Sequence, residues 1–183
     1  QDDYHRAGKD PHIWLDPVLA QNMVTTIADA FAVRDPANKD FYLKNAESFK
    51  VKLKDLDQRY AAGLASCKTR TIIYAGHSAF GYLARRYGLT QVSPYKGFSP
   101  DAEPSPKGIK AIIDTIHQLD ARVIYYEELV DPKVARVIAE ETGARMELLS
   151  AAHNVSKKDL SSATYLGIME TNLLKLKDGL RCQ

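Results

Sequence analysis

The chain has 183 residues, 45% of them hydrophobic, and its 25 basic and 23 acidic residues leave a formal net charge of +2. This length suits one domain of ordinary size, or one complete lobe with part of another. The balanced charge excludes the basic excess expected of a nucleic-acid-binding protein, and no apolar run reaches the roughly 18 residues of a transmembrane helix. We therefore expect a globular chain that binds no nucleic acid.

The first half of the chain carries two helical patterns. Asp16-Pro17 supplies an N-cap followed by proline at the first helical position, which predicts a helix over 17–33. The segment 37–64 has an apolar stripe and no sustained heptad, so we expect a rigid strut of about 40 Å rather than a coiled coil. The predicted apolar faces comprise Val18, Met23, Ile27, Ala30 and Phe31 in the first helix and Phe41, Phe49, Leu53, Leu56, Tyr60 and Leu64 in the second.

From residue 70 onward short apolar strands alternate with helices. The expected strands are 71–76, 91–95, 121–128 and 145–149, and the expected helices are 78–88, 105–119, 131–141 and 158–180. Ser78, Ser105 and Asp131 are the predicted N-caps of the first three of these helices. Such alternation predicts an α/β fold with a four-stranded, mostly parallel sheet flanked by helices. Ligands of such sheets bind at the carboxyl ends of the strands.

Two histidines stand where this rule places a ligand. His77 follows the strand 71–76, and its imidazole suits zinc and related ions; a hydrogen-bonding role at a helix N-terminus is the alternative. His12 lies in a segment stiffened by Pro11 and Pro17, and a pre-ordered ligand loses less entropy on binding. Because the two are far apart in sequence, they can share one ion only by converging in space.

Other acidic and imidazole groups compete for the same role. His153 follows the fourth strand, and Glu127 and Glu128 end the third, where a carboxylate can bind a metal or hold a ligating imidazole. His117 lies among isoleucines in a predicted helix, where a structural or surface role is expected. His5 lies in a polar N-terminal stretch.

The cysteines and the enzyme-like motifs give weaker signals. Cys67 and Cys182 form no C-x-x-C motif, which argues against a zinc knuckle or a thioredoxin-type site. They form either a disulfide, as in exported proteins, or two unrelated buried thiols. The stretch around Ser78 has the spacing G-x-S-x-x-G instead of the G-x-S-x-G of a nucleophile elbow. Neither H-E-x-x-H nor a glycine-rich phosphate loop occurs, so we expect no enzyme.

An ordered series of motifs resembles a known family. They are DPHIWLDP (10–17), the long helix, AGHSAFGYLARRYGL (75–89), GFSPDAEPSP (97–106), VIYYEELVDP (123–132) and TYLGIMETN (164–172). Together they resemble the zinc/manganese ABC-transporter solute-binding proteins, in which one long rigid helix joins two α/β lobes and the metal lies between them. The resemblance implies a remainder of the N-terminal lobe (1–35), an interlobe helix (36–66) and a complete C-terminal lobe (67–183). Most of the N-terminal lobe, with its early histidine ligand, is therefore expected to be missing from this chain, and Gln1 fits a start removed by processing, proteolysis or design.

The resemblance also implies a metal site. The family's D-P-H-x-W histidine is a ligand, which is His12 here, and the histidine after the first strand of the C-terminal lobe is His77. Many members have an aspartate ligand in an L-x-S-D context, where this chain has Ala151. Either His153 or Glu127 replaces it, or three protein ligands leave a position open. Nitrogen ligands favour zinc over manganese, although the family as a whole includes both.

The function implied is high-affinity capture of a divalent transition metal, zinc in preference to manganese, and its delivery to an ABC importer permease. Its place is the periplasm or the extracellular face of the cytoplasmic membrane, and a monomer is expected when the N-terminal lobe is present. Because binding needs neutral imidazoles, affinity is expected to fall as the pH drops through the histidine range near about 6.5. The alternatives are a surface adhesin with a structural metal and, less favoured, a zinc hydrolase.

Overall fold

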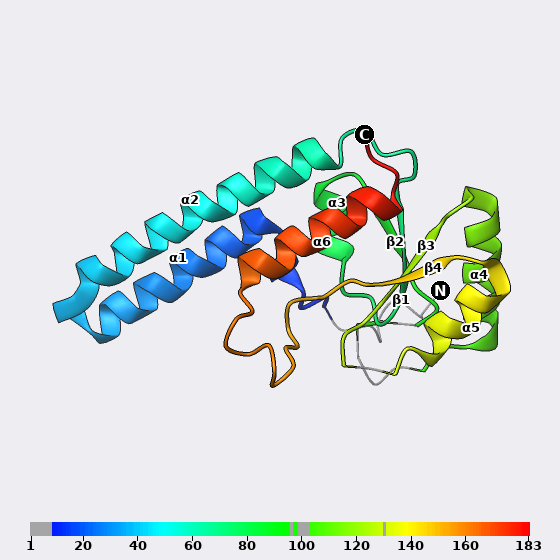
Figure 1. Cartoon of the computed structure of the whole chain (residues 1–183). Coiled ribbons are helices and arrows are strands. Elements are labelled where there is room, and N and C mark those ends of the chain that lie inside the picture. Colours follow the sequence, from blue (N-terminus) through cyan, green and yellow to red (C-terminus); the bar gives the residue numbers. More distant parts are fainter. Residues whose placement is uncertain (1–8, 96, 99–102, 130) are drawn as a thin grey trace, which may run out of the picture.

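The computed structural model describes residues 9–95, 97–98, 103–129 and 131–183. Two long helices, α1 (Pro17–Arg34) and α2 (Lys39–Gly63), form a hairpin that extends from an α/β body (Figure 1). The remaining helices and strands are η1 (Ile13–Leu15), η2 (Pro36–Asn38), β1 (Thr71–Ala75), α3 (Gly81–Arg86), β2 (Thr90–Val92), α4 (Pro106–Leu119), β3 (Val123–Tyr126), α5 (Lys133–Thr142), β4 (Arg145–Leu148) and α6 (Tyr165–Gly179). Within the described residues, no helix is both long and apolar enough to cross a membrane.

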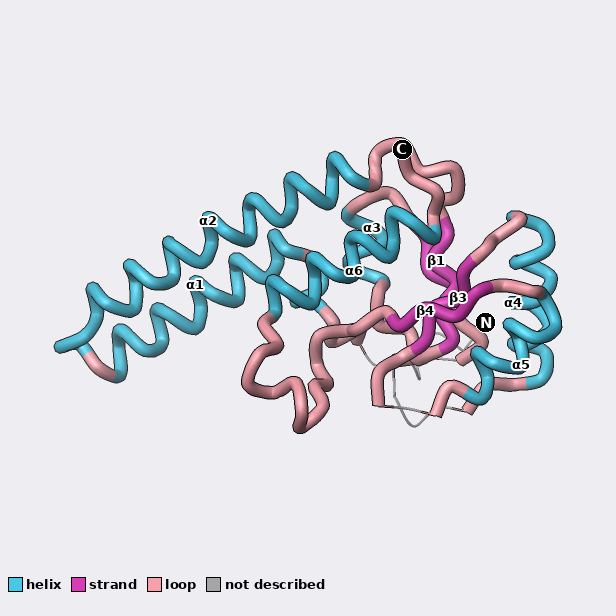
Figure 2. Tube along the Cα trace, in the orientation of Figure 1, coloured by secondary structure: helices cyan, strands magenta, loops and turns pink. Residues whose placement is uncertain are grey.

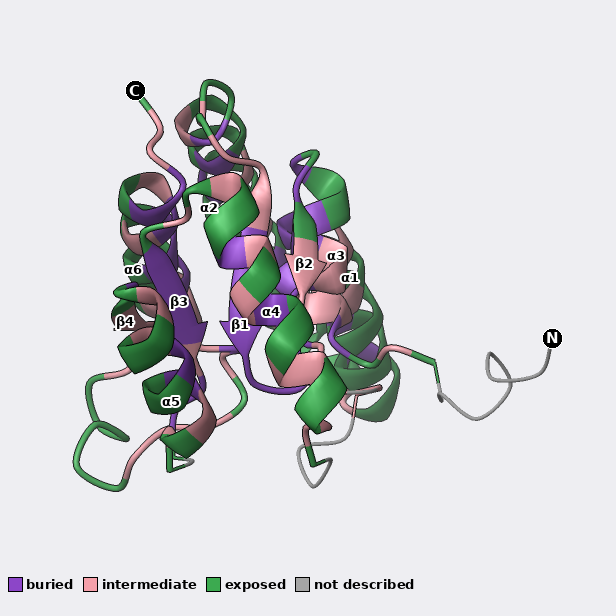
Figure 3. Ribbon diagram, turned by 90° about the vertical axis from the view of Figure 1, so that its right-hand side faces the viewer, coloured by how far each residue is buried: buried purple, intermediate pink, exposed green. Residues whose placement is uncertain are grey.

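The four strands form one parallel sheet in the order β2-β1-β3-β4, which confirms the predicted α/β class. Alternate residues of a strand face opposite sides of a sheet. Ile73 and Ile124 accordingly pack with α4 and α5, whereas Tyr74 and Tyr125 pack in the larger core with α2, α3 and α6. Figure 2 shows the sheet between these two layers, and Figure 3 shows that β1 and β3 are buried.

Helix starts were predicted with mixed success. Asp16 Oδ1 accepts hydrogen bonds from the Val18 and Leu19 amides at 2.8 and 3.4 Å, and Ser105 Oγ accepts one from the Gly108 amide at 3.0 Å, so both caps are confirmed. Neither Ser78 nor Asp131 caps a helix. Helix α3 begins only at Gly81, and α5 begins at Lys133 after an N-cap position occupied by Pro132, which offers no side-chain acceptor.

The last helix begins at Tyr165 and not at residue 158. Thr164 is its N-cap, with Oγ1 accepting a hydrogen bond from the Gly167 amide at 3.1 Å. Before it, the Asp159 carbonyl accepts bonds from the amides of Ser162 and Ala163 and closes a turn. Ser156 Oγ also donates to Asp159 Oδ2 at 2.6 Å and accepts from the Asp159 amide at 3.3 Å. Such local side-chain bonds compete with a regular helix, and residues 149–164 form a long loop.

The predicted apolar face of α1 is wrong. Its buried residues are Pro17, Ala20, Ala28 and Ala32, whereas Ile27 and Phe31 are 52% and 54% exposed. Alanines let the backbones of α1 and α2 approach closely, so the larger side chains point outward. The stripe of α2 is confirmed at Leu53, Leu56, Tyr60 and Leu64 but not at Phe41, which is 63% exposed.

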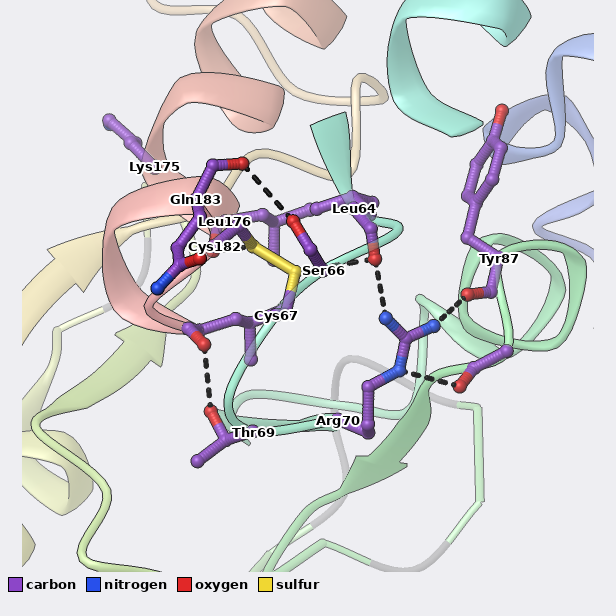
Figure 4. Close-up of a disulfide and its surroundings, with 12 residues drawn as sticks. Leu64, Ser66, Cys67, Thr69, Arg70, Tyr87, Lys175, Leu176, Cys182 and Gln183 are labelled. Atoms are coloured by element: carbon purple, nitrogen blue, oxygen red, sulfur yellow. Dashed lines mark hydrogen bonds between the residues drawn. A yellow bond between two sulfur atoms is a disulfide. The ribbon is translucent and has the colours of Figure 1, made fainter. Parts of the chain in front are cut away.

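The C-terminus is fastened to the beginning of the sheet domain (Figure 4). Cys67 and Cys182 form a disulfide, which decides between the two alternatives for these residues. Beside it, the amides of Lys68 and Thr69 donate to the carbonyls of Arg181 and Leu180. The Arg70 guanidinium donates to the carbonyls of Leu64, Tyr87 and Gly88. The end of α2, α3 and the chain terminus are thereby linked at the side of the sheet where the strands begin.

Candidate metal centre

The strand register brings three chain segments to the same edge of the sheet. Ala75 pairs with Tyr126, and Tyr126 pairs with Leu148, so β1, β3 and β4 end level with one another. His77 follows β1, Glu127 follows β3, and the loop after β4 carries His153. His77 and Glu127 are almost fully buried, at 3% and 5% exposed.

His12 reaches this edge from the N-terminal segment, which the body of the protein holds in place. Leu15 is fully buried in the larger core, and the adjacent Asp16 caps α1. The Trp14 indole Nε1 donates to the Ala151 carbonyl at 2.8 Å, and the Tyr165 hydroxyl donates to the Trp14 carbonyl at 2.6 Å. His12 is therefore buried, at 4% exposed.

The three imidazoles converge. The Nε2 atoms of His12 and His77 are 3.1 Å apart, and the ring centroids lie at 5.0 Å for His12 and His77, 5.5 Å for His77 and His153, and 6.0 Å for His12 and His153. Two nitrogens bound tetrahedrally to one zinc ion at about 2.0–2.1 Å lie about 3.3–3.4 Å apart. The separation of the two Nε2 atoms is close to this value, which is the geometry that two ligands of one tetrahedral ion need.

A carboxylate holds the other nitrogen of each buried imidazole. His12 Nδ1 is 2.8 Å from Asp10 Oδ1, which also accepts the His12 amide at 3.0 Å. His77 Nδ1 is 2.9 Å from Glu127 Oε2. A carboxylate at Nδ1 favours the proton on that nitrogen and leaves the Nε2 lone pair for a metal. The pairs therefore orient both rings with Nε2 toward the space that they share.

Glu127 also faces the third histidine. Its Oε1 is 3.7 Å from His153 Nε2, and this buried oxygen accepts no hydrogen bond from the described residues. Ligand atoms of His77, Glu127 and His153 all lie within 4.8 Å of one another. Glu128, the other acid at this strand end, instead accepts a hydrogen bond from Ser150 Oγ at 2.9 Å.

Burial favours the neutral form of His12, which is the form that binds a metal. It lowers the pKa of His12 below its ordinary value of 6.5; Asp10 opposes this shift, and the neighbouring His77 and His153 reinforce it. A small cavity of about 20 Å³ also adjoins His77 and Glu127, but it is lined by Tyr95, Tyr126 and Pro132 and by neither His12 nor His153. It is therefore separate from the space that the three imidazoles share.

The other candidates lie elsewhere. His117 is exposed on α4, as its surface role predicts, and His5 lies outside the described residues. Asp10 was not predicted as a partner of His12. The only signal was a carboxylate two residues before a histidine in a proline-stiffened segment, a spacing that lets Asp10 reach both the amide and the ring of His12.

The fold and the site define a class, namely an α/β protein with a cluster of two buried histidines and one exposed histidine at the carboxyl edge of a parallel sheet. Residues 1–179 match the family described as zinc-uptake complex component A, periplasmic. The chain belongs to this family.

Relatives and solved structures agree with this membership. The chain is 41% identical over 172 residues to the high-affinity zinc uptake system protein ZnuA of Bacillus subtilis, covering 93% of this chain and 53% of that protein. It is 35% identical over 174 residues to the zinc-binding lipoprotein AdcA of Streptococcus pneumoniae, covering 94% and 34%. The chain thus spans about half or less of the length of these curated relatives.

Among solved structures, laminin-binding protein Lmb of Streptococcus agalactiae superposes with a TM-score of 0.85 at 37% identity, covering 93% of this chain and 64% of that one. The Zn(II)-bound ZnuA-like domain of Streptococcus pneumoniae AdcA superposes with a TM-score of 0.77 at 35% identity, covering 93% and 64%. Both likenesses extend over nearly all of this chain.

Proposed function

We propose that this chain captures a zinc ion through His12, His77 and His153. The observation that carries the proposal is the convergence of three imidazoles, two of which have Nε2 atoms 3.1 Å apart and Nδ1 atoms held by the carboxylates of Asp10 and Glu127. Zinc takes neutral imidazole readily and binds in tetrahedral sites. Manganese favours carboxylate and water ligands, so this nitrogen-rich set selects zinc.

Glu127 orients His77 in this proposal and supplies negative charge beside the ion. Its Oε2 is engaged by His77 Nδ1, while its Oε1 is directed toward His153 at 3.7 Å. The family resemblance implies an aspartate at the position of Ala151, and in this proposal His153, two residues later, takes its place. The fourth position of a tetrahedral ion stays open for water or for a ligand from outside the residues that the structure describes.

The biological role that we propose is high-affinity zinc uptake on the outer side of the cytoplasmic membrane, with transfer to an ABC importer permease and no turnover. Support comes from the family description, which names a periplasmic zinc-uptake component, and from the relatives, which are named as zinc uptake and zinc-binding proteins. We also propose that residues 1–35 are the remainder of an N-terminal lobe, 36–66 the interlobe helix and 67–183 the C-terminal lobe.

The test is a titration with Zn²⁺ and Mn²⁺ against a competing chelator, on the wild-type chain, His77→Ala and His117→Ala. His117 is an exposed histidine outside the cluster and serves as a matched control. We expect tight zinc binding that is lost in His77→Ala and retained in His117→Ala. Equal zinc affinity of all three proteins would refute the site.

A second candidate function has one observation in its favour. The structure of Lmb is described as that of a bifunctional protein with adhesin and metal transporting activity, and this chain superposes on it closely. An adhesin role predicts laminin binding that survives the double substitution His12→Ala, His77→Ala. No laminin binding by the wild-type chain argues for metal capture alone.

A further inference from the structure

His153 differs from the other histidines of the cluster in how it is held. His77 directly follows a buried strand and its adjoining glycine, whereas His153 lies in the long loop between β4 and α6. The residues that lead to it are nevertheless tightly packed, because Leu149 and Ala151 are both fully buried. Some feature of the fold therefore fixes residues 149–152, which we call the His153 approach.

Asn172, on α6, forms hydrogen bonds to the backbone of the His153 approach. Its Oδ1 accepts a hydrogen bond from the Ser150 amide at 3.1 Å, and its Nδ2 donates to the Ser150 carbonyl at 2.7 Å. Asn172 is 1% exposed. A carboxamide is the side-chain group that accepts and donates within one plane, so it can satisfy both backbone groups of a single residue.

Three further hydrogen bonds fix the His153 approach. Ser150 Oγ donates to Glu128 Oε1 at 2.9 Å and accepts from the Ala152 amide at 3.1 Å. The Trp14 indole donates to the Ala151 carbonyl. Side chains thus bind four backbone polar groups in the three successive residues Ser150, Ala151 and Ala152. Ala152, with a φ of 56°, adopts the left-handed conformation that L-residues with a Cβ avoid, and this turn leads directly into His153.

We propose that Asn172 is a positioning residue for the metal centre. It fixes Ser150 and the turn at Ala152, and this turn brings His153 to His12 and His77. This inference rests on the proposed function. Packing alone does not require the amide, since Asn172 lies between the apolar core residues Met169, Leu173 and Leu176 of the same helix, where leucine would bury more apolar area. Burying a carboxamide costs free energy unless it is hydrogen-bonded. The amide of Asn172 makes its hydrogen bonds to Ser150 and so fixes the position of that residue.

The test is a double-mutant cycle on zinc affinity with Asn172→Asp and His153→Ala. Aspartate is nearly isosteric and still accepts from the Ser150 amide, but it cannot donate to the Ser150 carbonyl. Loss of an outer-shell partner typically weakens metal affinity about 10–100-fold, so we expect Asn172→Asp to lose about tenfold or more. In the His153→Ala background the same substitution should change zinc affinity less than about twofold, because the group on which it acts is gone.

Lys175→Met is the matched control. Lys175 also lies on α6 and donates to the Leu148 carbonyl at 2.7 Å, one residue before the His153 approach, so its loss should leave zinc affinity unchanged. If Asn172→Asp folds poorly, Ser150→Ala tests the same idea, since it removes the bonds to Glu128 and Ala152 and keeps both backbone bonds to Asn172. Its loss of affinity should likewise vanish in the His153→Ala background.

The outcomes separate this inference from the proposed function. Equal losses in both backgrounds, or wild-type affinity of both Asn172→Asp and Ser150→Ala, would overturn the role of Asn172 while leaving zinc capture intact. If His153→Ala binds zinc like the wild type but His77→Ala does not, the inference fails and the site reduces to the remaining ligands. Faster hydrogen exchange of the Ala152 amide in metal-free Asn172→Asp, which leaves the Ser150 Oγ acceptor of that amide in place, would support the hold even if zinc affinity proved weak, and unchanged exchange would contradict it.

Discussion

Replacing Glu127 distinguishes two roles of its carboxylate, which either orients His77 or binds the metal directly. Its carboxylate is 5% exposed on the side chain and lies 2.9 Å from His77 Nδ1. If it orients His77, Glu127→Ala removes an outer-shell partner and weakens zinc binding about 10–100-fold, which is about 1.4–2.8 kcal/mol. Glu127→Gln retains an acceptor for the Nδ1 proton and loses only the charge, so its loss should be smaller than that of Glu127→Ala.

The assay is chelator competition at pH 7.5 on wild type, Glu127→Gln, Glu127→Ala and His77→Ala, with circular dichroism to confirm that each variant is folded. The order of zinc affinity that we expect is wild type, Gln, Ala and then His77→Ala. Wild-type affinity in Glu127→Ala would refute the orienting role. A loss as large as that of His77→Ala would instead make Glu127 a direct ligand.

Three further predictions concern pH, the disulfide and the helix hairpin. Because the pKa of His12 is lowered below 6.5, its contribution to stability is complete above pH 6.5 and is lost as the pH falls through the pKa of His12 in the folded protein. An NMR titration should show His12 protonating below pH 6.5. A midpoint above that value would contradict the burial argument. Reducing the Cys67–Cys182 bond, which closes a loop with a sequence separation of 115, should lower the free energy of unfolding by about 2–4 kcal/mol in urea denaturation and leave zinc affinity intact. Ala28→Leu should destabilise the close packing of α1 on α2 by about 1–3 kcal/mol, whereas Ile27→Lys, at a 52% exposed position, should be within about 0.5 kcal/mol of wild type in thermal denaturation.

The sheet could be predicted because its signals are local. Alternating apolar strands and helices indicate a parallel sheet without knowledge of the tertiary contacts. The caps at Asp16 and Ser105 depend only on neighbouring residues. The face of α1 could not be predicted in this way. Large apolar residues and alanines both count as hydrophobic in a periodic pattern, and only the presence of α2 decides that Ala28 faces inward while Phe31 does not.

The site residues divide in the same way, into those with a local sequence signal and those placed by tertiary contacts. His77 and Glu127 follow from the rule that strand ends carry ligands, and His12 follows from a rigid motif. His153 remained one of several possibilities because its place depends on tertiary contacts of Trp14 and Asn172 with the loop before it. Residues that act on the backbone of a distant segment have no signature in sequence spacing, and neither does Asp10, whose role requires the ring orientation of His12.

The attachment of His12 bears on how the ion is released. By sequence His12 belongs to the predicted remainder of the N-terminal lobe, yet its neighbours Trp14 and Leu15 are bound to Ala151, Tyr165 and the main core. All three imidazoles therefore belong to one packed body, and a rotation of another lobe about α2 would not by itself separate them. All three lie outside helices and strands, but His153 is in the long loop between β4 and α6, and its side chain is 25% exposed. If the proposed site holds zinc, we expect release to require that the His153 approach loosens or that a competing ligand enters at the open fourth position.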